Sequence, residues 1–251
     1  MRKPLIAGNW KMYKTVSEAA AMLNDFKAKV ADVKDAEIVI CPVYTSLVEA
    51  VKVTKGSNVM IGAQDVYWEK EGAFTGQVSP QMIKDVGCTH TLIGHSERRQ
   101  YFGETNETVN KKVKAALASG LIPIMCVGET LAEREKGNTF NVVESHTAGG
   151  LAGLSAEDAR KLVIAYEPVW AIGTGKTATP AQAEEVHKFI RGVLEKLYDK
   201  NTAESMRILY GGSVKPENIG DLMSQANIDG GLVGGASLKA DSFAQIVKFK
   251  I

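Results

Sequence analysis

The stretch from Thr89 to Gly128, THTLIGHSERRQYFGETNETVNKKVKAALASGLIPIMCVG, contains a complete strand, helix and strand repeat. Its two ends, THTLIGH and LIPIMCVG, are short and almost continuously apolar, which is typical of parallel strands buried on both faces. Between them, apolar side chains recur at helical spacing until Gly120 ends the pattern. This stripe comprises Val109, Val113, Ala116 and Leu117. The stretch therefore predicts two parallel strands joined by an amphipathic helix.

The same alternation extends along the whole chain. Six further apolar runs are PLIAGNW from Pro4, AEIVICP from Ala36, NVMIGAQ from Asn58, KLVIAYEP from Lys161, RILYGGS from Arg207 and DGGLVGGAS from Asp229. Eight strand and helix units in 251 residues average about 31 residues each, the size of a βα repeat, and no linker divides them. We predict an α/β fold, a single (β/α)8 barrel domain over residues 1–251, with a doubly wound open sheet as the alternative.

Local signals mark several helix ends. Thr15–Glu18 and Ser46–Glu49 have the spacing of a capping box, and Thr179–Gln182 adds Pro180 at the first helical position. The Gly149–Gly150 pair lies in a helical stretch where better helix formers are expected, which predicts a local loss of stability.

Composition argues against several classes of function. Thirty basic and 29 acidic residues give a net charge of +1 without charged tails, so neither nucleic acid nor a membrane surface is an expected partner. The cysteines, Cys41, Cys88 and Cys126, form no CxxC pair and predict buried, reduced thiols and no metal site. No signal-peptide core and no membrane-spanning run is present, so a cytoplasmic protein is expected.

Chemically active residues follow the carboxyl ends of the predicted strands, where a (β/α)8 barrel carries its active site. Singly, each has an ordinary explanation, such as a solvated lysine, a structural histidine or a tight turn. Together, an amide, a cation, an imidazole, a carboxylate and two glycine pairs would share one mouth. These residues are Asn9, Lys11, His95, Glu167, Gly211, Gly212, Ser213, Gly234 and Gly235.

The segment AYEPVWAIGTGKTATP, from Ala165 to Pro180, contains GTGKT and superficially suggests a nucleotide-binding loop. Such a loop needs glycine five residues before its Gly-Lys pair, and Trp170 occupies that position. Residues 168–178 are longer than most βα connections and combine a stiff start with flexible glycines, which predicts a mobile lid.

These motifs together closely resemble the triosephosphate isomerase family. The matching segments run in order from Ala7 to Leu238: AGNWKM, IGAQ, GAFTG, SP, IGHSERR, PIMCVGET, IAYEPVWAIGTGKTATP, YGGSVKP and LVGGASL. The resemblance implies a TIM barrel that interconverts dihydroxyacetone phosphate and D-glyceraldehyde 3-phosphate, a reaction of glycolysis and gluconeogenesis. It also implies a homodimer without a cofactor.

The resemblance further implies roles for particular residues. Glu167 would be the base, neutral His95 the electrophile, and Asn9 and Lys11 would hold the substrate. The phosphate would be bound by backbone N–H groups of Gly173, Ser213, Gly234 and Gly235. Ser96, Glu97 and Cys126 would support the site.

The charge state of His95 follows from the chemistry. An imidazolium would be too acidic to exchange protons with an enediolate, so the ring should be neutral. We predict that Ser96 caps the short turn Glu97–Arg99, and that the helix-end dipole lowers the pKa of His95. His90, at the other end of its strand, is expected to be structural.

The connection from Gln64 to Ser79 is too long for a plain βα loop and carries Tyr67, Trp68 and Phe74. In the family this loop enters the neighbouring subunit, which implies that Thr75 contacts the partner near Asn9 and Lys11. The implied interface residues are Thr75, Phe74, Gln64 and Arg98. A loop folded back on its own barrel is the alternative.

Two other functions remain open from the residues alone. One is a different enzyme built on a phosphate-binding barrel, which would explain the glycine pairs but not the Asn9, Lys11, His95 and Glu167 set. The other is a catalytically inactive barrel that only binds a phosphorylated metabolite, against which the intact acid-base residues argue.

Overall fold

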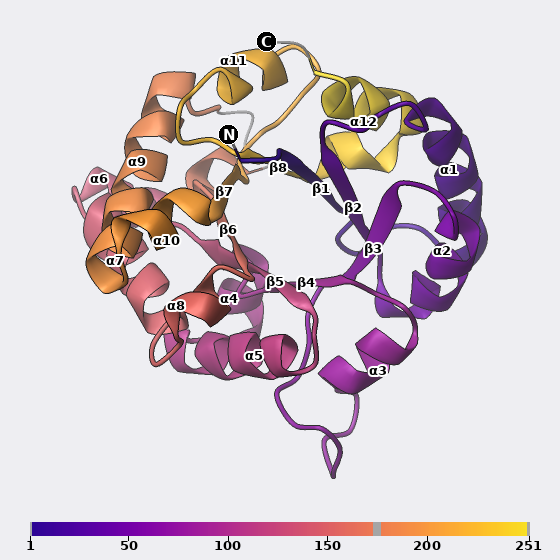
Figure 1. The fold of residues 1–251 in the computed structure, drawn as a ribbon, viewed down its shortest axis with the longest axis horizontal. Helices are drawn as coiled ribbons and strands as arrows, with labels where there is room; N and C mark the ends of the chain where they lie inside the picture. The colour runs from indigo at the N-terminus through magenta and orange to yellow at the C-terminus, as the bar shows by residue number, and fades with distance from the viewer. Residues whose placement is uncertain (1, 173–176, 250–251) are drawn as a thin grey trace.

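The strands form a closed parallel barrel in the order β1 to β8 (Figure 1). The computed structural model describes residues 2–172 and 177–249. The strands are β1 (Leu5–Asn9), β2 (Glu37–Cys41), β3 (Val59–Ala63), β4 (His90–Ile93), β5 (Ile122–Val127), β6 (Val163–Tyr166), β7 (Arg207–Tyr210) and β8 (Gly230–Val233). Each falls within one predicted run, and β1 pairs with β8 to close the ring. The predicted (β/α)8 barrel is confirmed, and the open sheet is wrong.

Helices surround the barrel on its outside (Figure 1). The α-helices are α1 (Val16–Lys29), α2 (Leu47–Thr54), α3 (Pro80–Asp85), α4 (Ser96–Phe102), α5 (Asn106–Ala118), α6 (Leu131–Glu135), α7 (Thr139–Gly150), α8 (Ala156–Ala159), α9 (Pro180–Leu197), α10 (Lys200–Ser205), α11 (Ile219–Met223) and α12 (Ala240–Val247). Short 3-10 turns are η1 (Tyr44–Ser46), η2 (Val169–Ala171) and η3 (Gly235–Leu238). In the described residues, we find no helix with the length and apolar character needed to cross a membrane.

Two of the three predicted capping signals have the expected geometry. Thr15 with Glu18 and Thr179 with Gln182 form complete capping boxes at α1 and α9. The prediction for Ser46 is wrong, because η1 runs directly into α2. Ser46 therefore has φ −102° and ψ −5° instead of an extended cap conformation, and its hydroxyl accepts no cap hydrogen bond.

Close packing explains the glycine pair in α7. A Cβ atom on Gly149 would lie 2.8 Å from Cβ of Asn106 at the start of α5, and one on Gly150 would lie 2.3 Å from Sδ of Met125 in β5. Larger residues would hold α7 away from both neighbours. Glycine is a poor helix former, but at these two positions it allows α7 to pack closely against α5 and β5.

The core has two layers, as expected for a barrel filled by side chains and covered by helices. Between strands and helices, buried residues of the α5 stripe such as Val109, Val113 and Ala116 join one large cluster. The barrel interior holds Leu5, Ala7, Val39, Cys41, Leu92, Ile124, Cys126, Val163, Ala165, Leu209 and Leu232. Cys41, Cys88 and Cys126 are buried free thiols, as predicted.

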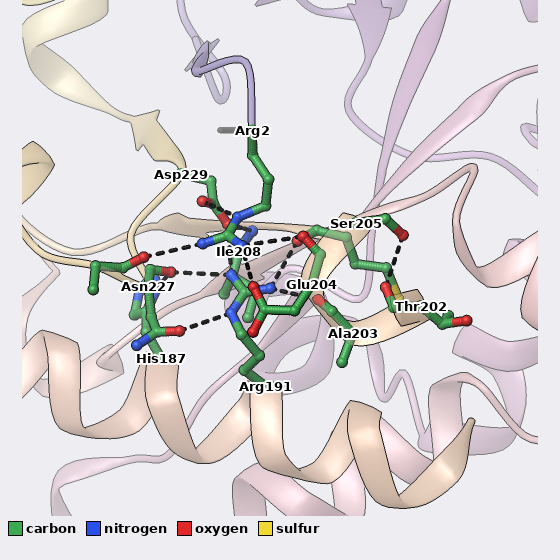
Figure 2. Close-up of polar contacts among 12 residues, drawn as sticks. Arg2, His187, Arg191, Thr202, Ala203, Glu204, Ser205, Ile208, Asn227 and Asp229 are labelled. Atoms are coloured by element: carbon green, nitrogen blue, oxygen red, sulfur yellow. Dashed lines mark hydrogen bonds and ion pairs between the residues drawn. The ribbon is translucent and has the colours of Figure 1, made fainter. Parts of the chain in front are cut away.

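A buried ion pair joins α9 to the amino-terminal end of the barrel (Figure 2). Nη2 of Arg191 lies 2.8 Å from Oδ2 of Asp229, and this oxygen also accepts the N–H of Ile208 in β7. Arg2, just before β1, donates to the other oxygen of Asp229. Arg191 also donates to the carbonyls of Ala203 and Met206. The contacts tie α9 to the segments that precede β1, β7 and β8.

Candidate active site

A cavity of about 360 Å³ opens at the carboxyl ends of the strands. It brings together the predicted residues Asn9, Lys11, His95, Glu167, Gly211, Gly212, Ser213, Gly234 and Gly235. These come from the last residue of β1 and from the segments that follow β1, β4, β6, β7 and β8, which barrel closure places around one mouth. Gly173, also predicted for the site, lies outside the described residues.

Glu167 and His95 face each other within this cavity. Oε1 of Glu167 lies 2.8 Å from Nε2 of His95, and Oε2 accepts the backbone N–H of Ser96 at 2.9 Å. The two residues are only 2% and 5% exposed. A carboxylate and an imidazole held just after separate strands, and shielded from water, can exchange protons with a ligand placed against both.

The helix after β4 begins one residue earlier than predicted. α4 starts at Ser96, and its cap is His95, whose Nδ1 accepts the N–H of Glu97 at 3.2 Å. The prediction that Ser96 is the cap is therefore wrong, and Ser96 instead holds Glu167 through its backbone. Because Nδ1 accepts a hydrogen bond, the proton of a neutral ring must be on Nε2, which faces the cavity.

The pKa of His95 does not shift in the predicted direction. Burial lowers it, but the adjacent Glu167 carboxylate raises it, and the pKa stands above its usual value. For Glu167, burial raises the pKa, but the imidazole and the Ser96 N–H lower it below its usual value. The prediction of a lowered His95 pKa is wrong with Glu167 in this position, because the facing carboxylate outweighs burial.

Lys11 is held in an unusual backbone conformation. Its φ is 51°, in the left-handed region that a lysine rarely adopts. Oδ1 of Asn9 accepts its N–H at 3.0 Å, and Nε2 of Gln64 donates to its carbonyl at 2.8 Å. Nζ of Lys11 contacts Oε1 of Glu97 at 2.6 Å. Asn9 and Gln64 thus brace the strained residue, so Gln64 contacts Lys11 within this chain.

The opposite end of the cavity presents backbone N–H groups. In the part of the chain that the structure describes, no group accepts a hydrogen bond from the N–H of Ser213, Gly234 or Gly235. Gly235 begins η3. The side chain of Asn218 holds the other loop in place by donating a hydrogen bond to the Ser213 carbonyl. Free N–H groups at a helical turn suit a phosphate.

Several lining residues were not predicted from the sequence. Tyr13, Lys215 and Leu232 also line the cavity, and Ile172 reaches it from the lid segment. Lys215 lies in the YGGSVKP motif and could have been found there. Tyr13 and Leu232 carry no local signal, because an exposed tyrosine and a strand leucine are common everywhere.

The start of the lid segment is anchored to a buried carboxylate that sequence reasoning missed. Oε1 of Glu129 accepts Nε1–H of Trp170 at 2.9 Å and pairs with Arg134, and Tyr166 also donates to this carboxylate. Glu129 is fully buried. The PIMCVGET motif contains it, but only the fold brings Trp170 to it. Residues 173–176 of the predicted lid lie outside the described residues.

The predicted supporting residue Cys126 and the predicted interface residue Arg98 lie around this site. Cys126 is buried beside Glu167, and burial raises the pKa of its thiol well above the usual value. Arg98 pairs with Asp65 at 3.0 Å and with Glu104 at 2.5 Å, so its guanidinium already forms ion pairs within this chain. In the described residues, no cluster of three or more His, Cys, Asp or Glu side chains could hold a metal ion.

The long connection from Gln64 to Ser79 extends beyond the ring of helices next to α3 (Figure 1). Its aromatic side chains pack on one another, with the rings of Tyr67 and Trp68 4.0 Å apart and those of Tyr67 and Phe74 4.9 Å apart. Phe74 remains 39% exposed, and Thr75 is exposed as well. The tip of this loop is thus not covered by its own barrel.

Comparisons with known proteins agree with the geometry. The family model described as triosephosphate isomerase matches residues 4–250. The triosephosphate isomerase of Trichlorobacter lovleyi is 60% identical over 250 residues and that of Geotalea uraniireducens 59% over 249, each covering at least 99% of both chains. A crystal structure of triosephosphate isomerase from Bartonella henselae has a TM-score of 0.88 and 40% identity, and the match covers 97% of each chain. The chain belongs to the triosephosphate isomerase family.

Proposed function

We propose that the residues of this cavity carry out the reaction of the family, the interconversion of dihydroxyacetone phosphate and D-glyceraldehyde 3-phosphate, with Glu167 as base and His95 as neutral electrophile. The observation that carries this assignment is the 2.8 Å contact between Oε1 of Glu167 and Nε2 of His95 inside a buried cavity. A substrate that displaces this contact would have a carbon-bound proton at the carboxylate and its carbonyl oxygen at the imidazole.

The proton transfers balance with these two groups alone. Glu167 removes a proton from the hydroxymethyl carbon of dihydroxyacetone phosphate, while Nε2–H of His95 polarises the carbonyl oxygen, which gives an enediolate. His95 gives its proton to that oxygen and takes the proton of the neighbouring hydroxyl. Glu167 then returns its proton to the former carbonyl carbon, which leaves the aldehyde and regenerates both groups.

A neutral His95 is compatible with the pKa found above. The Glu167 carboxylate raises this pKa, whereas burial and the charge of Lys11 lower it. A carbonyl oxygen at Nε2 would take the place of the carboxylate oxygen and remove the Glu167 hydrogen bond, one of the causes of the increased pKa, while Glu97 would still raise it. The hydrogen bond from Glu97 N–H to Nδ1 also favours the neutral ring, because an imidazolium has no lone pair there.

Asn9 and Lys11 are proposed to hold the substrate, with the Lys11 ammonium opposing the charge of enediolate and phosphate. The braced backbone of Lys11 supports this role, because strain of this kind is retained where a side chain must be aimed. Ser213, Gly234 and Gly235 are proposed to bind the phosphate through backbone N–H groups, with Gly173 contributing from the lid. Closure of residues 168–178 would keep water from the enediolate.

A homodimer is proposed from the loop that carries Thr75. Phe74 is 39% exposed at a projecting tip, and a cavity of about 250 Å³ lies beside the active site. That cavity is lined by Lys11, Tyr44, Gln64, Glu97, Arg98 and others, so a partner loop seated in it would cover Lys11. Gln64 and Arg98 would meet the partner while keeping their contacts within the chain. Family membership and the reduced thiols also support a cytoplasmic location.

Glu167→Asp tests the proposed base. The shorter side chain keeps its charge but retracts on the order of 1 Å, which should lower kcat at least ~100-fold in a coupled triose assay. Glu157→Asp, an identical change on exposed α8, is the control and should keep normal turnover. Near-normal kcat in Glu167→Asp would remove Glu167 from its role. A wild-type chain without triose interconversion would favour one of the two alternative barrels.

A further inference from the structure

A second and larger cavity lies outside the catalytic one. Its volume is about 830 Å³, within the range of sites that take small organic ligands. It is bounded by α4, the start of α5, the segment that follows β5, α7 and the base of the lid segment. Its lining includes Arg99, Thr105, Cys126, His146, Val169 and Trp170. The proposed reaction uses none of this volume.

Arg99 provides the cavity with a guanidinium that forms no ion pair in the part of the chain that the structure describes. Its Nε donates to the Gly94 carbonyl at 3.0 Å and its Nη1 to Oδ1 of Asn106 at 2.9 Å, both neutral acceptors. Its Nη2 is buried and has no partner among the described residues. Burial lowers the pKa of Arg99, and Cys126, Glu104 and Glu167 oppose this effect, but among the described side chains no carboxylate lies within ion-pair distance of it. A buried, unpaired guanidinium favours an anionic partner.

Two further features of the wall favour the same charge. Nδ1 of His146 accepts the N–H of Gly128 at 3.4 Å, so the proton of the neutral ring is on Nε2 as a donor. The thirteen-residue helix α5 begins at this cavity, where Thr105 and Asn106 line it. The amino terminus of a helix carries partial positive charge.

The acidic residues of the wall form contacts of their own. Oε1 of Glu104 pairs with Lys112 and Arg98, whereas its buried Oε2 has no hydrogen-bond partner among the described residues. Glu133 accepts the N–H and the hydroxyl of Thr130 in a capping box. Apolar surface from Val127, Leu131, Val169 and Trp170 makes up much of the remaining wall. The cavity thus combines apolar walls with one guanidinium that has a free N–H group and no ion-pair partner among the described residues.

We propose that this cavity binds a small monoanion with an apolar body, an aliphatic or aromatic carboxylate, and that its occupation slows isomerisation without blocking the substrate. The carboxylate pairs with Arg99, and the apolar part lies against Val169 and Trp170. Such a ligand differs chemically from a triose phosphate, which has no aliphatic or aromatic body.

The wall shared with the active site provides the coupling. Ser96 lines this cavity, and its N–H holds Oε2 of Glu167. Gly128 also lines it and contacts the backbone of Glu167. Val169 and Trp170 begin the proposed lid. A ligand that braces these groups resists their movement during turnover and therefore lowers kcat, while the substrate cavity stays open.

The experiment uses 2-naphthoate as the probe and 2-naphthamide as its neutral counterpart. In the wild-type protein, 2-naphthoate should lower kcat with little change in KM, and titration calorimetry should show that inorganic phosphate does not displace it. The amide should bind at least ten-fold more weakly, because it lacks the charge that Arg99 favours.

Variants locate the site. Arg99→Gln should weaken 2-naphthoate binding at least ten-fold. Gln100→Trp, which enlarges an exposed residue at the rim, should weaken binding without disturbing the fold. Arg160→Gln makes the same charge change beyond α8 and should bind normally. Displacement by phosphate, unchanged binding in Arg99→Gln and Gln100→Trp, or no binding at millimolar probe would each overturn the proposal.

Discussion

Gly128 offers a sharp test of how the barrel positions the catalytic carboxylate. A Cβ atom at this position would lie 1.8 Å from the backbone oxygen of Glu167 and 2.7 Å from its carbonyl carbon. Gly128→Ala must therefore separate these two backbones. Opening the shorter contact to 3.0 Å, below which real Cβ contacts are essentially not found, requires a shift of about 1.2 Å.

This shift would act directly on the chemistry. Glu167 holds His95 at 2.8 Å and the Ser96 N–H at 2.9 Å, and neither contact survives a displacement of that size intact. Because a misplacement on the order of 1 Å costs ~100-fold in rate, kcat/KM of Gly128→Ala should fall by about that factor. Overpacking should also lower stability by about 1–3 kcal/mol, so the variant stays folded at room temperature.

The assay is a coupled measurement of triose interconversion on purified protein, with circular dichroism to confirm folding and calorimetry to measure Tm. Gly192→Ala is the matched control, because no atom lies within 4 Å of the added Cβ in α9. That variant should keep full activity and a normal or slightly raised Tm. A folded Gly128→Ala enzyme within three-fold of the wild-type kcat/KM would show that Glu167 is not held through this contact.

Three further predictions concern stability and association. Asp229→Asn leaves the charge of buried Arg191 unpaired and should cost about 3–5 kcal/mol in denaturant unfolding, and a loss under 1 kcal/mol would contradict it. Burial lowers the pKa of His90 from 6.5 to about 4. As the pH falls from 6.5 to 4, this histidine is therefore protonated in the unfolded chain but not in the folded chain. Stability should be full above pH 6.5 and fall through this window, and His90→Gln should reduce the slope by ~1.4 kcal/mol per pH unit; an unchanged slope would count against the assignment. Thr75→Arg should give a folded, mostly monomeric protein with much reduced turnover in sedimentation and kinetic assays, whereas an active dimer would refute the proposed interface.

The fold and much of the site were predictable because their signals are local. A strand such as LIPIMCVG can be recognised from its almost continuous run of apolar residues. The capping box at Thr15 involves only the side chains and backbone of nearby residues. Eight such units in alternation favour a closed barrel, in which the carboxyl ends of the strands share one mouth. His95 and Glu167 could therefore be placed together from sequence position, with the family motifs supplying their proposed roles.

Tertiary structure decided how those residues interact. His95, and not Ser96, is the cap of α4, and barrel closure sets the Glu167 carboxylate against its ring, which reverses the expected pKa shift. The sequence likewise did not indicate that Gln64 braces Lys11 or that Glu129 holds Trp170. These contacts join residues far apart in the chain, and their energies depend on distances of a few ångströms that exist only after the barrel closes.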